Sequence, residues 1–319
     1  MDNEQARLAE IIHRGSLPME PVPPPPLPPE WEALVYAAPG PARPGAPRNQ
    51  AAPPAAAPVR AVLFDVYGTL FCSAAGDIGT TGGPGRRDDG LDSLAGEYAP
   101  ALTGKNLRDY FQSRVREIHR ELSARVSCPE VRVEEIWARF LRENGGGEQR
   151  ARELALRYEL AVNPVYPMPG AGEVIARLQK TRCVLGIISN AQFFTPLLFA
   201  AFLGGLPEDL GFDPALLVYS FELGEAKPGA RLFARAANRL AERGIPPAQC
   251  LFVGNDMLTD IYGAVSAGFR GVLFAGDRRS LRLREGDARI RGLKPSHVIR
   301  RLADLPPLTV NYSSPQADD

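Results

Sequence analysis

The sequence lacks the residue groupings that build disulfide scaffolds and zinc centres. Its 319 residues include only four cysteines, with no C-x-x-C pair, and only three histidines. Disulfide-rich domains and structural zinc sites need several such residues at short, regular spacings. We therefore expect neither a disulfide framework nor a metal centre built from histidine.

Net charge and long apolar segments are also absent. The 37 Lys and Arg balance the 37 Asp and Glu, so no global positive charge is available to hold nucleic acid or an anionic membrane. The longest apolar stretch, 196–206, is shorter than the roughly 20 residues that span a bilayer. The N-terminus is acidic and has no apolar signal core. We expect a cytoplasmic protein with no nucleic-acid or membrane partner.

Proline is distributed unevenly along the chain. Of the 31 prolines, 15 lie between Pro18 and Pro58, where proline removes amide donors and favours extended backbone. Residues 4–14 have the pattern of a short amphipathic helix, which would not be stable alone. We expect residues 1–58 to form a disordered Pro/Ala-rich arm that acts as a tether. The alternative is that Pro23 to Pro29 docks into the aromatic-lined groove of a partner.

Strands alternate with helices in the rest of the sequence. A short apolar run from Val59 ends at Asp65, as expected of a strand buried on both faces. Helical periodicity follows in three segments, 107–126, 133–144 and 148–162. Further elements are expected as helices at 171–179, 194–203, 229–242 and 258–267 and as strands at 183–188, 216–220, 250–253 and 271–274. This order predicts an α/β fold, a Rossmann-like parallel sheet wound on both faces, with an α-helical cap domain inserted after the first strand.

The pattern also predicts where the parts of the chain begin and end. We expect the disordered arm at 1–58, a Rossmann-like core at 59–72 and 164–305, a helical cap with a Gly-rich flap at 73–163, and a disordered tail at 306–319. The insertion follows the carboxyl end of the first strand, where open parallel sheets bind ligands.

Polar residues follow several of the predicted strands. Asp65 can act as a nucleophile, Ser189 can donate a hydrogen bond to the transferring group, and Lys227 can neutralise its charge. Asp256 can join Asp65 in holding Mg²⁺, a cation that prefers oxygen ligands. Asp260 follows four residues later and can pair with Lys227. These side chains are expected to meet because carboxyl ends of parallel strands share one edge.

Each of these residues also has an ordinary structural interpretation. Asp65 can be a turn residue, and Ser189 can cap the helix that follows it. Lys227 can be the last loop residue before a helix that starts with proline. Asp256 can cap the next helix, with Asp260 as a first-turn acid. Their convergence at one edge is what favours a catalytic site.

Four motifs in order resemble the haloacid dehalogenase superfamily over roughly residues 59–305. The motifs are FDVYGTL, the Ser-Asn pair after VLGII, the Lys-Pro pair after ELGEA, and GNDMLTD. The resemblance implies these motif residues: Asp65 as nucleophile, Ser189 as the second-motif hydroxyl, Lys227 as the third-motif lysine, and Asp256 and Asp260 as the fourth-motif acids.

The resemblance further implies a substrate site and a metal site. The residues expected to contact a small anionic substrate are Tyr67, Thr69 and Asn190. The expected ligands of Mg²⁺ are Asp65, the backbone carbonyl of Tyr67, Asp256 and Asn255.

Two positions depart from the superfamily's phosphatases. The residue two after the nucleophile is there an aspartate that protonates the leaving group, but here it is Tyr67, whose ordinary pKa near 10 suits that task poorly. Asn255 stands where metal-dependent members often have aspartate. The string FD-x-YGTL with Ser189 is similar to the L-2-haloacid dehalogenases, whose halide leaving group needs no proton.

Other residues argue against the dehalogenase branch. Those enzymes work without metal, yet Asp256 is present here. They have a tyrosine six residues after the third-motif lysine, where this chain has Phe233. Their substrate-binding arginine follows the first motif, where this chain has only Arg86 and Arg87 in a Gly-rich stretch.

The sequence therefore predicts a hydrolase of this superfamily that works through a covalent aspartyl intermediate. The interpretation favoured is a Mg²⁺-dependent phosphatase acting on a small phosphorylated metabolite, either a phosphoester or an acyl phosphate. A metal-independent 2-haloacid dehalogenase is one alternative. The other is a catalytically weak relative that acts as a binding or interaction protein.

Overall fold

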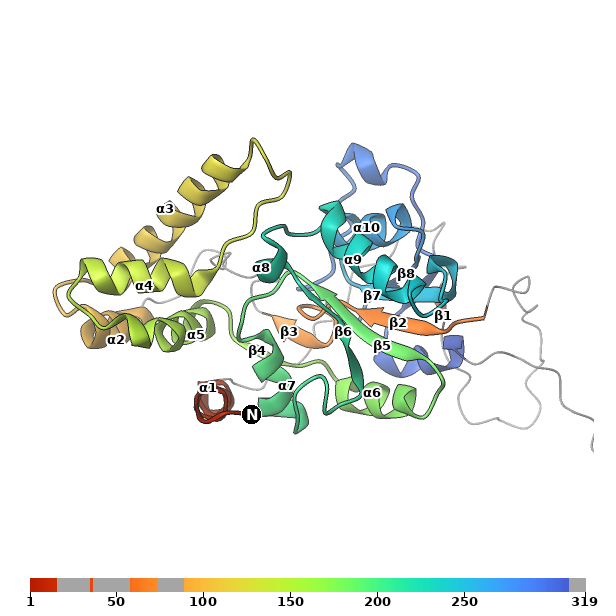
Figure 1. The fold of residues 1–319 in the computed structure, drawn as a ribbon, viewed down its shortest axis with the longest axis horizontal. Helices are drawn as coiled ribbons and strands as arrows, with labels where there is room; N and C mark the ends of the chain where they lie inside the picture. Colours follow the sequence, from red (N-terminus) through yellow and green to blue (C-terminus); the bar gives the residue numbers. More distant parts are fainter. Residues whose placement is uncertain (16–34, 37–57, 74–88, 310–319) are drawn as a thin grey trace, which may run out of the picture.

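A seven-stranded parallel sheet forms the centre of the molecule (Figure 1). The computed structural model describes residues 1–15, 35–36, 58–73 and 89–309. In chain order the strands are β1 (Val35–Tyr36), β2 (Ala61–Phe64), β5 (Val184–Ser189), β6 (Phe212–Tyr219), β7 (Cys250–Gly254), β8 (Arg270–Phe274) and β9 (His297–Ile299). Their spatial order is β1-β9-β8-β7-β2-β5-β6, with every pairing parallel. The predicted α/β fold is confirmed.

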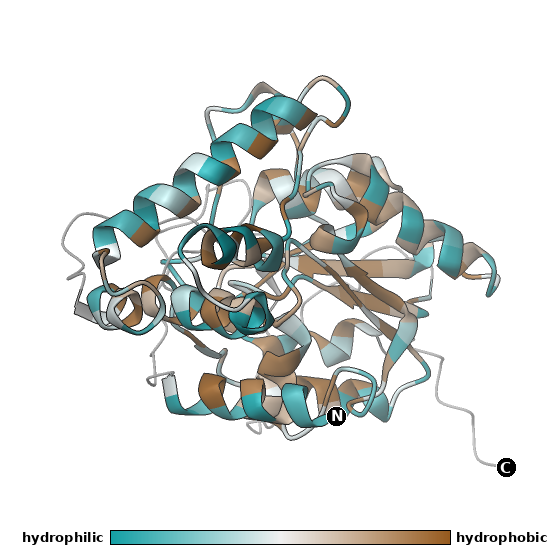
Figure 2. Cartoon of the chain, turned by 60° about the vertical axis from the view of Figure 1, so that its left-hand side comes forward, coloured by the Kyte–Doolittle hydropathy of each residue, from teal (hydrophilic) through white to brown (hydrophobic). Residues whose placement is uncertain are grey.

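Helices cover both faces of the sheet, as its apolar strands require. The flanking helices are α6 (Ala171–Gln179), α7 (Thr195–Leu203), α8 (Ser220–Leu223), α9 (Ala230–Ala241) and α10 (Gly263–Ser266). In Figure 1, α6 and α7 lie below the sheet, and α9 and α10 lie above it. Alternate residues of β2 enter different cores: Val62 and Phe64 pack in one cluster, Ala61 and Leu63 in the other. The strands are accordingly almost entirely hydrophobic in Figure 2.

Along the chain, a helical insert separates β2 from β5 and the later strands of the sheet. It lies between β3 (Phe71–Ser73) and β4 (Val165–Pro167), which pair antiparallel. Its helices are α2 (Asp89–Tyr98), α3 (Gly104–Leu122), α4 (Val133–Glu143) and α5 (Ala151–Val162). The sequence analysis expected three helices and a loop at 73–95. It missed α2, which forms because Leu91, Leu94 and Tyr98 bury one face of the helix. Residues 74–88, with Arg86 and Arg87, lie outside the described residues.

The expectation of a disordered arm is wrong for the first residues of the chain. Asn3–Gly15 forms helix α1, whose Leu8 and Ile12 are buried. The helix packs against α5 of the insert and α7 of the core, which supply the tertiary contacts that an isolated short helix lacks. Within the same expected arm, β1 pairs with β9. Residues 16–34, including the docking segment Pro23 to Pro29, and 37–57 lie outside the described residues.

Three other local predictions also need correction. The helix expected at 258–267 is a π-helical segment, Met257–Tyr262, that continues into α10. Strand β9 was not predicted because His297–Ile299 is too short to give a pattern. Part of the expected tail, Pro306–Thr309, is a 3₁₀ helix with Pro306 and Thr309 buried, while 310–319 lies outside the described residues. In the described part of the chain, no helix is long and apolar enough to cross a membrane.

Candidate active site

Asp65 lies directly after β2, at the carboxyl edge of the sheet. Its backbone N–H donates to the carbonyl of Val253 on β7, 2.9 Å away, which fixes its position. Ser189, the last residue of β5, donates its hydroxyl to Oδ1 of Asp65 at 3.0 Å. The ammonium of Lys227 donates to the same oxygen at 2.7 Å. The neighbouring strands β2 and β5 therefore bring the first two predicted catalytic residues together, and the loop after α8 adds the third.

The two carboxylate oxygens of Asp65 have different surroundings. Oδ1 accepts both side-chain hydrogen bonds, whereas Oδ2 accepts none from the described residues. The side chain as a whole is 8% exposed. A charged donor on one oxygen orients the carboxylate and leaves its other oxygen open to attack an electrophile.

Lys227 joins two acidic residues of the site. Its Nζ donates to Oδ1 of Asp260 at 2.6 Å as well as to Asp65, and its side chain is almost fully buried. Burial acts to lower the pKa of Lys227, but the two carboxylates outweigh it and the net shift is upward. The backbone N–H of Lys227 donates to Oδ1 of Asn190 at 2.7 Å, so the predicted substrate residue Asn190 instead holds this loop.

Asp260 is held from the opposite side by the turn that follows β7. Its Oδ2 accepts the backbone N–H groups of Asn255 and Asp256, both at 2.9 Å. A Cβ on Gly254 would lie 2.4–2.5 Å from this side chain, so the close approach requires glycine. Burial raises the pKa of Asp260 to about 7, against the lowering effect of Lys227. The predicted pairing of Asp260 with Lys227 matches this arrangement.

Asn255 packs against the turn after the nucleophile. Its Oδ1 accepts from Oγ1 of Thr69 at 3.1 Å, and its Nδ2 donates to the carbonyl of Ser280 at 2.7 Å. Gly68 has φ of +88°, and a Cβ there would lie 2.6–2.8 Å from the amide of Asn255. Only glycine permits both the turn and this contact. Thr69, predicted to contact substrate, is bonded to Asn255 instead.

Asp256 is engaged in an ion pair that the sequence analysis did not predict. Its Oδ2 accepts from Nε and Nη2 of Arg284 at 2.9 and 2.6 Å. Its Oδ1 accepts the N–H groups of Leu258 and Thr259, which caps the π-helical segment. Both oxygens are thus engaged in this structure, and a metal-ligand role for Asp256 stays a prediction. No sequence signal pointed to Arg284, because it lies in an irregular segment 28 residues further along the chain.

The remaining predicted oxygens fit a divalent cation. They are the carboxylate of Asp65, the carbonyl of Tyr67, which accepts no backbone hydrogen bond in the described part of the chain, and Oδ1 of Asn255. The contact of Asn255 with Gly68 places its amide beside this turn. Carboxylate, carbonyl and amide oxygens are the hard ligands that Mg²⁺ prefers, with water and substrate filling the remaining positions. Among the described residues no cluster of three His, Cys, Asp or Glu is found, so Asp65 is the only carboxylate in this set of oxygens.

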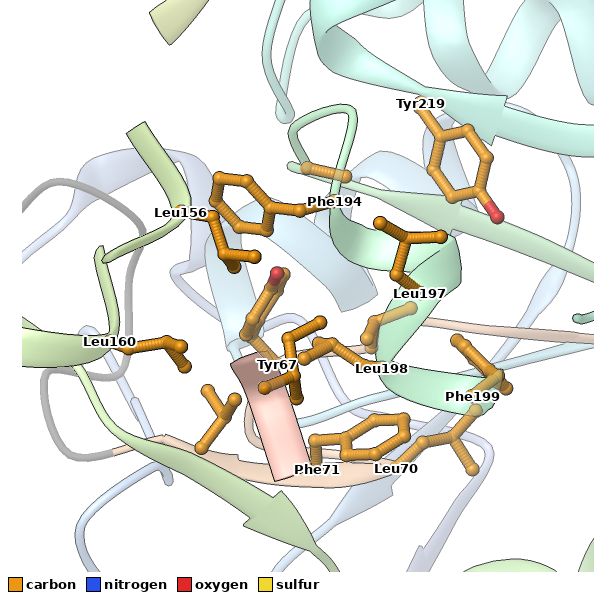
Figure 3. Close-up of a cluster of buried hydrophobic side chains, with 14 of the residues drawn as sticks. Tyr67, Leu70, Phe71, Leu156, Leu160, Phe194, Leu197, Leu198, Phe199 and Tyr219 are labelled. Carbon is orange, nitrogen blue, oxygen red and sulfur yellow. The ribbon is translucent and has the colours of Figure 1, made fainter. Parts of the chain in front are cut away.

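The side chain of Tyr67 points into the contact between the insert and the core (Figure 3). Its ring is buried beside Leu156 of α5 and Leu198 of α7, and its hydroxyl lies 2.9 Å from Oγ1 of Thr195. Burial raises the pKa of Tyr67 far above its usual value near 10. The hydroxyl therefore stays protonated and is engaged with Thr195 rather than available as a predicted substrate contact.

The loop between α3 and α4 also reaches the core beside Lys227. Glu130 accepts the hydroxyl of Ser220 at 2.6 Å and the side-chain amide of Gln192 at 3.3 Å. The carbonyl of Cys128 accepts the backbone N–H of Ala226, the residue before Lys227, at 2.7 Å. The sequence analysis found no motif in this segment, because polar contacts between distant loops leave no periodic pattern.

Comparisons with known proteins agree with this geometry. The family model for haloacid dehalogenase-like hydrolases matches residues 59–268, more than half of the chain. Phosphoserine phosphatase of Thermus thermophilus is 32% identical over 162 residues, which cover 47% of this chain and 61% of that protein, so the chain spans less than two thirds of this relative. Ribulose-1,5-bisphosphate 5-phosphatase of Halopiger xanaduensis is 25% identical over 254 residues, 77% of this chain and 97% of that protein.

One of two solved structures that resemble the chain supports the fold. A 2-haloacid dehalogenase from Pseudomonas syringae pv. Tomato DC3000 superposes with a TM-score of 0.50 at 22% identity, covering 78% of this chain and 97% of that one. A HAD phosphatase from Thermococcus onnurineus gives a TM-score of 0.46 at 21% identity, with coverage of 78% and 97%. Because the family model matches from the strand before Asp65 to the helix after Asp260, the chain belongs to the haloacid dehalogenase-like hydrolases.

Proposed function

We propose that this hydrolase is a phosphatase that transfers the phosphoryl group of a small anionic metabolite to Asp65 and then to water. The observation that carries the proposal is the asymmetric hold on Asp65. Oδ1 is fixed by Ser189 and Lys227, while Oδ2 accepts no bond from the described residues. Phosphatases are also named among its relatives, for phosphoserine and for ribulose bisphosphate. These similarities favour a phosphorylated substrate over a halogenated one.

In the proposed reaction, Oδ2 of Asp65 attacks phosphorus and the leaving group departs. Negative charge grows on the phosphoryl oxygens during this step. The hydroxyl of Ser189 and the ammonium of Lys227, which both contact Asp65, can stabilise that charge. Asp260 keeps Lys227 charged and in place. Water then cleaves the Asp65–phosphoryl bond and releases inorganic phosphate.

We further propose that Mg²⁺ is held by Asp65, the carbonyl of Tyr67 and Asn255. When bound there, the cation would neutralise charge on the phosphate and orient it toward the nucleophile. The helical insert is proposed to act as a cap over the site. Its support is the contact of the α3–α4 loop with Ser220 and Ala226, beside Lys227.

The test compares phosphate release by the wild type and by Asp65→Asn. With acetyl phosphate and p-nitrophenyl phosphate in the presence of Mg²⁺, the variant is expected to lose at least about 10³-fold in kcat, as for loss of a covalent nucleophile. Asp109→Asn is the matched control, since Asp109 lies on the surface of α3. Circular dichroism and thermal melting check that both variants fold. Full activity of Asp65→Asn would rule out the covalent mechanism.

The metal-independent dehalogenase is the second candidate, and one observation favours it. Oδ2 of Asp256 is bound by Arg284, which occupies an oxygen that a metal ion would otherwise use. That candidate predicts chloride release from L-2-chloropropionate in EDTA, with no phosphate release from either phosphate substrate. A protein that only binds ligands would give neither product.

A further inference from the structure

The residue two positions after the nucleophile is poorly placed to supply a proton. Tyr67 is 5% exposed, and its ring lies among Leu156, Leu198 and Phe194 (Figure 3). Its hydroxyl is bonded to Thr195. The hydroxyl is therefore engaged with Thr195 inside the apolar contact between α5 and α7, shielded from solvent.

The described acids nearest to Asp65 are committed to other partners. Asp260 accepts from Lys227 on one oxygen and from two backbone N–H groups on the other. Asp256 is paired with Arg284 and caps the turn. Glu159, which faces Tyr67 from α5, accepts from Nδ2 of Asn163 at 2.9 Å. Each of these three carboxyls is thus engaged with a partner within the described part of the chain.

From this arrangement we infer that the enzyme is selective for phosphoryl donors whose leaving group departs as a stable anion, such as an acyl phosphate or a phosphoanhydride. The inference rests on the proposed phosphatase function and narrows its substrate class. The buried ring of Tyr67 occupies the position from which an acid could act, and its hydroxyl takes no part in the reaction.

The chemistry balances without an added proton. When Oδ2 of Asp65 bonds to phosphorus, the bond from phosphorus to the acyl oxygen breaks and its electron pair leaves on a carboxylate. A carboxylic acid has a pKa of about 4, so its anion is stable at neutral pH. Water then attacks the phosphoryl-enzyme, its proton passes to solvent, and phosphate and the Asp65 carboxylate are released. An alkyl phosphate would instead expel an alkoxide, which is about as basic as hydroxide and so is not a stable anion at neutral pH.

The experiment measures kcat/KM of the wild type with Mg²⁺ for acetyl phosphate, phosphoserine and a series of aryl phosphates of graded phenol acidity. A positioned general acid contributes about 10²–10⁴-fold. Acetyl phosphate is therefore expected to exceed phosphoserine by at least about 10²-fold, with a steep fall across the aryl series. A ratio within tenfold and a flat aryl series would overturn the inference, because both require a proton donor.

The matched variant is Tyr67→Phe, which keeps the buried ring and removes only the hydroxyl. The ratio of the two kcat/KM values is expected to change less than about twofold. If the phenol were the acid, phosphoserine hydrolysis would fall about 10²–10⁴-fold while acetyl phosphate hydrolysis stayed constant. The leaving-group series is measured on the wild type, so it tests the inference even if Tyr67→Phe folds poorly.

Failure of this inference can be distinguished from failure of the proposed function. If Asp65→Asn loses both substrates and the wild type cleaves them equally, the phosphatase stands and the selectivity is wrong. If Asp65→Asn cleaves acetyl phosphate as fast as the wild type, the covalent mechanism itself is wrong, and the inferred selectivity is wrong with it.

Discussion

The guanidinium of Arg284 holds Oδ2 of Asp256 through two N–H groups, at 2.9 and 2.6 Å. Arg284 is also the non-glycine residue with positive φ among the described residues, at 55°, a conformation that costs roughly 1 kcal/mol for an L-residue. The ion pair neutralises a carboxylate next to Asn255, a proposed metal ligand. Arg284 therefore bears on how strongly the site attracts a cation.

Replacing Arg284 with glutamine is expected to strengthen cation binding. Asp256 would regain an uncompensated negative charge beside the proposed metal ligands, so Mg²⁺ should raise the melting temperature of Arg284→Gln more than that of the wild type. Thermal melting across a Mg²⁺ titration measures this without relying on turnover. Arg289→Gln is the control, because Arg289 pairs with Asp287 at the surface of the same segment. An unchanged Mg²⁺ response in Arg284→Gln would contradict the prediction.

Loss of the ammonium of Lys227 should both inactivate and destabilise the protein. Lys227→Met would leave Asp65 and Asp260 buried without their counter-ion, at a cost of about 3–5 kcal/mol in the free energy of unfolding. Urea denaturation measures the loss. Adding Asp260→Asn removes one of the two stranded charges and should recover part of the stability, but not the activity. If the double variant is less stable than Lys227→Met, the electrostatic explanation fails.

Stability should fall at alkaline pH through the same group. The folded-state pKa of Lys227 lies above the unfolded value of 10.5, because the two carboxylates outweigh the effect of burial. Its contribution is therefore fully present below pH 10.5 and decreases as the pH rises beyond it. Urea unfolding of the wild type and Lys227→Met at increasing pH should show their difference in stability shrinking above that value. A difference that stays constant into strongly alkaline solution would argue against a raised pKa.

Helix α1 should stabilise the contact between the insert and the core. Ile12 is fully buried, and Arg7 and Glu4 of the same helix pair with Glu153 and Arg152 of α5 at 2.6 and 3.0 Å. Ile12→Ala is expected to cost about 2–5 kcal/mol, because it opens a cavity where the helix meets α5 and α7.

The neighbouring Ile11 supplies a matched comparison for that variant. It is only partly buried, so Ile11→Ala should cost clearly less in urea denaturation. Equal losses from the two substitutions would mean that α1 does not pack as described.

Much of the core could be predicted from the sequence, because its signals are local. A buried β-branched run that ends at Asp65 marks a strand, and the same reasoning located Ser189 and the turn before Asp260. Parallel strands end at one edge, so the meeting of Asp65, Ser189 and Lys227 follows from the alternation of strands and helices alone.

The partners of Asp256, Tyr67 and Ile12 were decided by the tertiary structure. Arg284 reaches Asp256 from an irregular segment with no periodic pattern. The hydroxyl of Tyr67 meets Thr195 across 128 residues, whereas the family resemblance had implied that this tyrosine contacts substrate. Helix α1 is too short to be stable by its own hydrogen bonds and forms because α5 and α7 bury its apolar face. Propensity and periodicity act over a few residues, so they determine the elements and their polar ends. Contacts between side chains of distant segments depend on how those segments pack. They form only once the chain has folded, so local patterns cannot predict them.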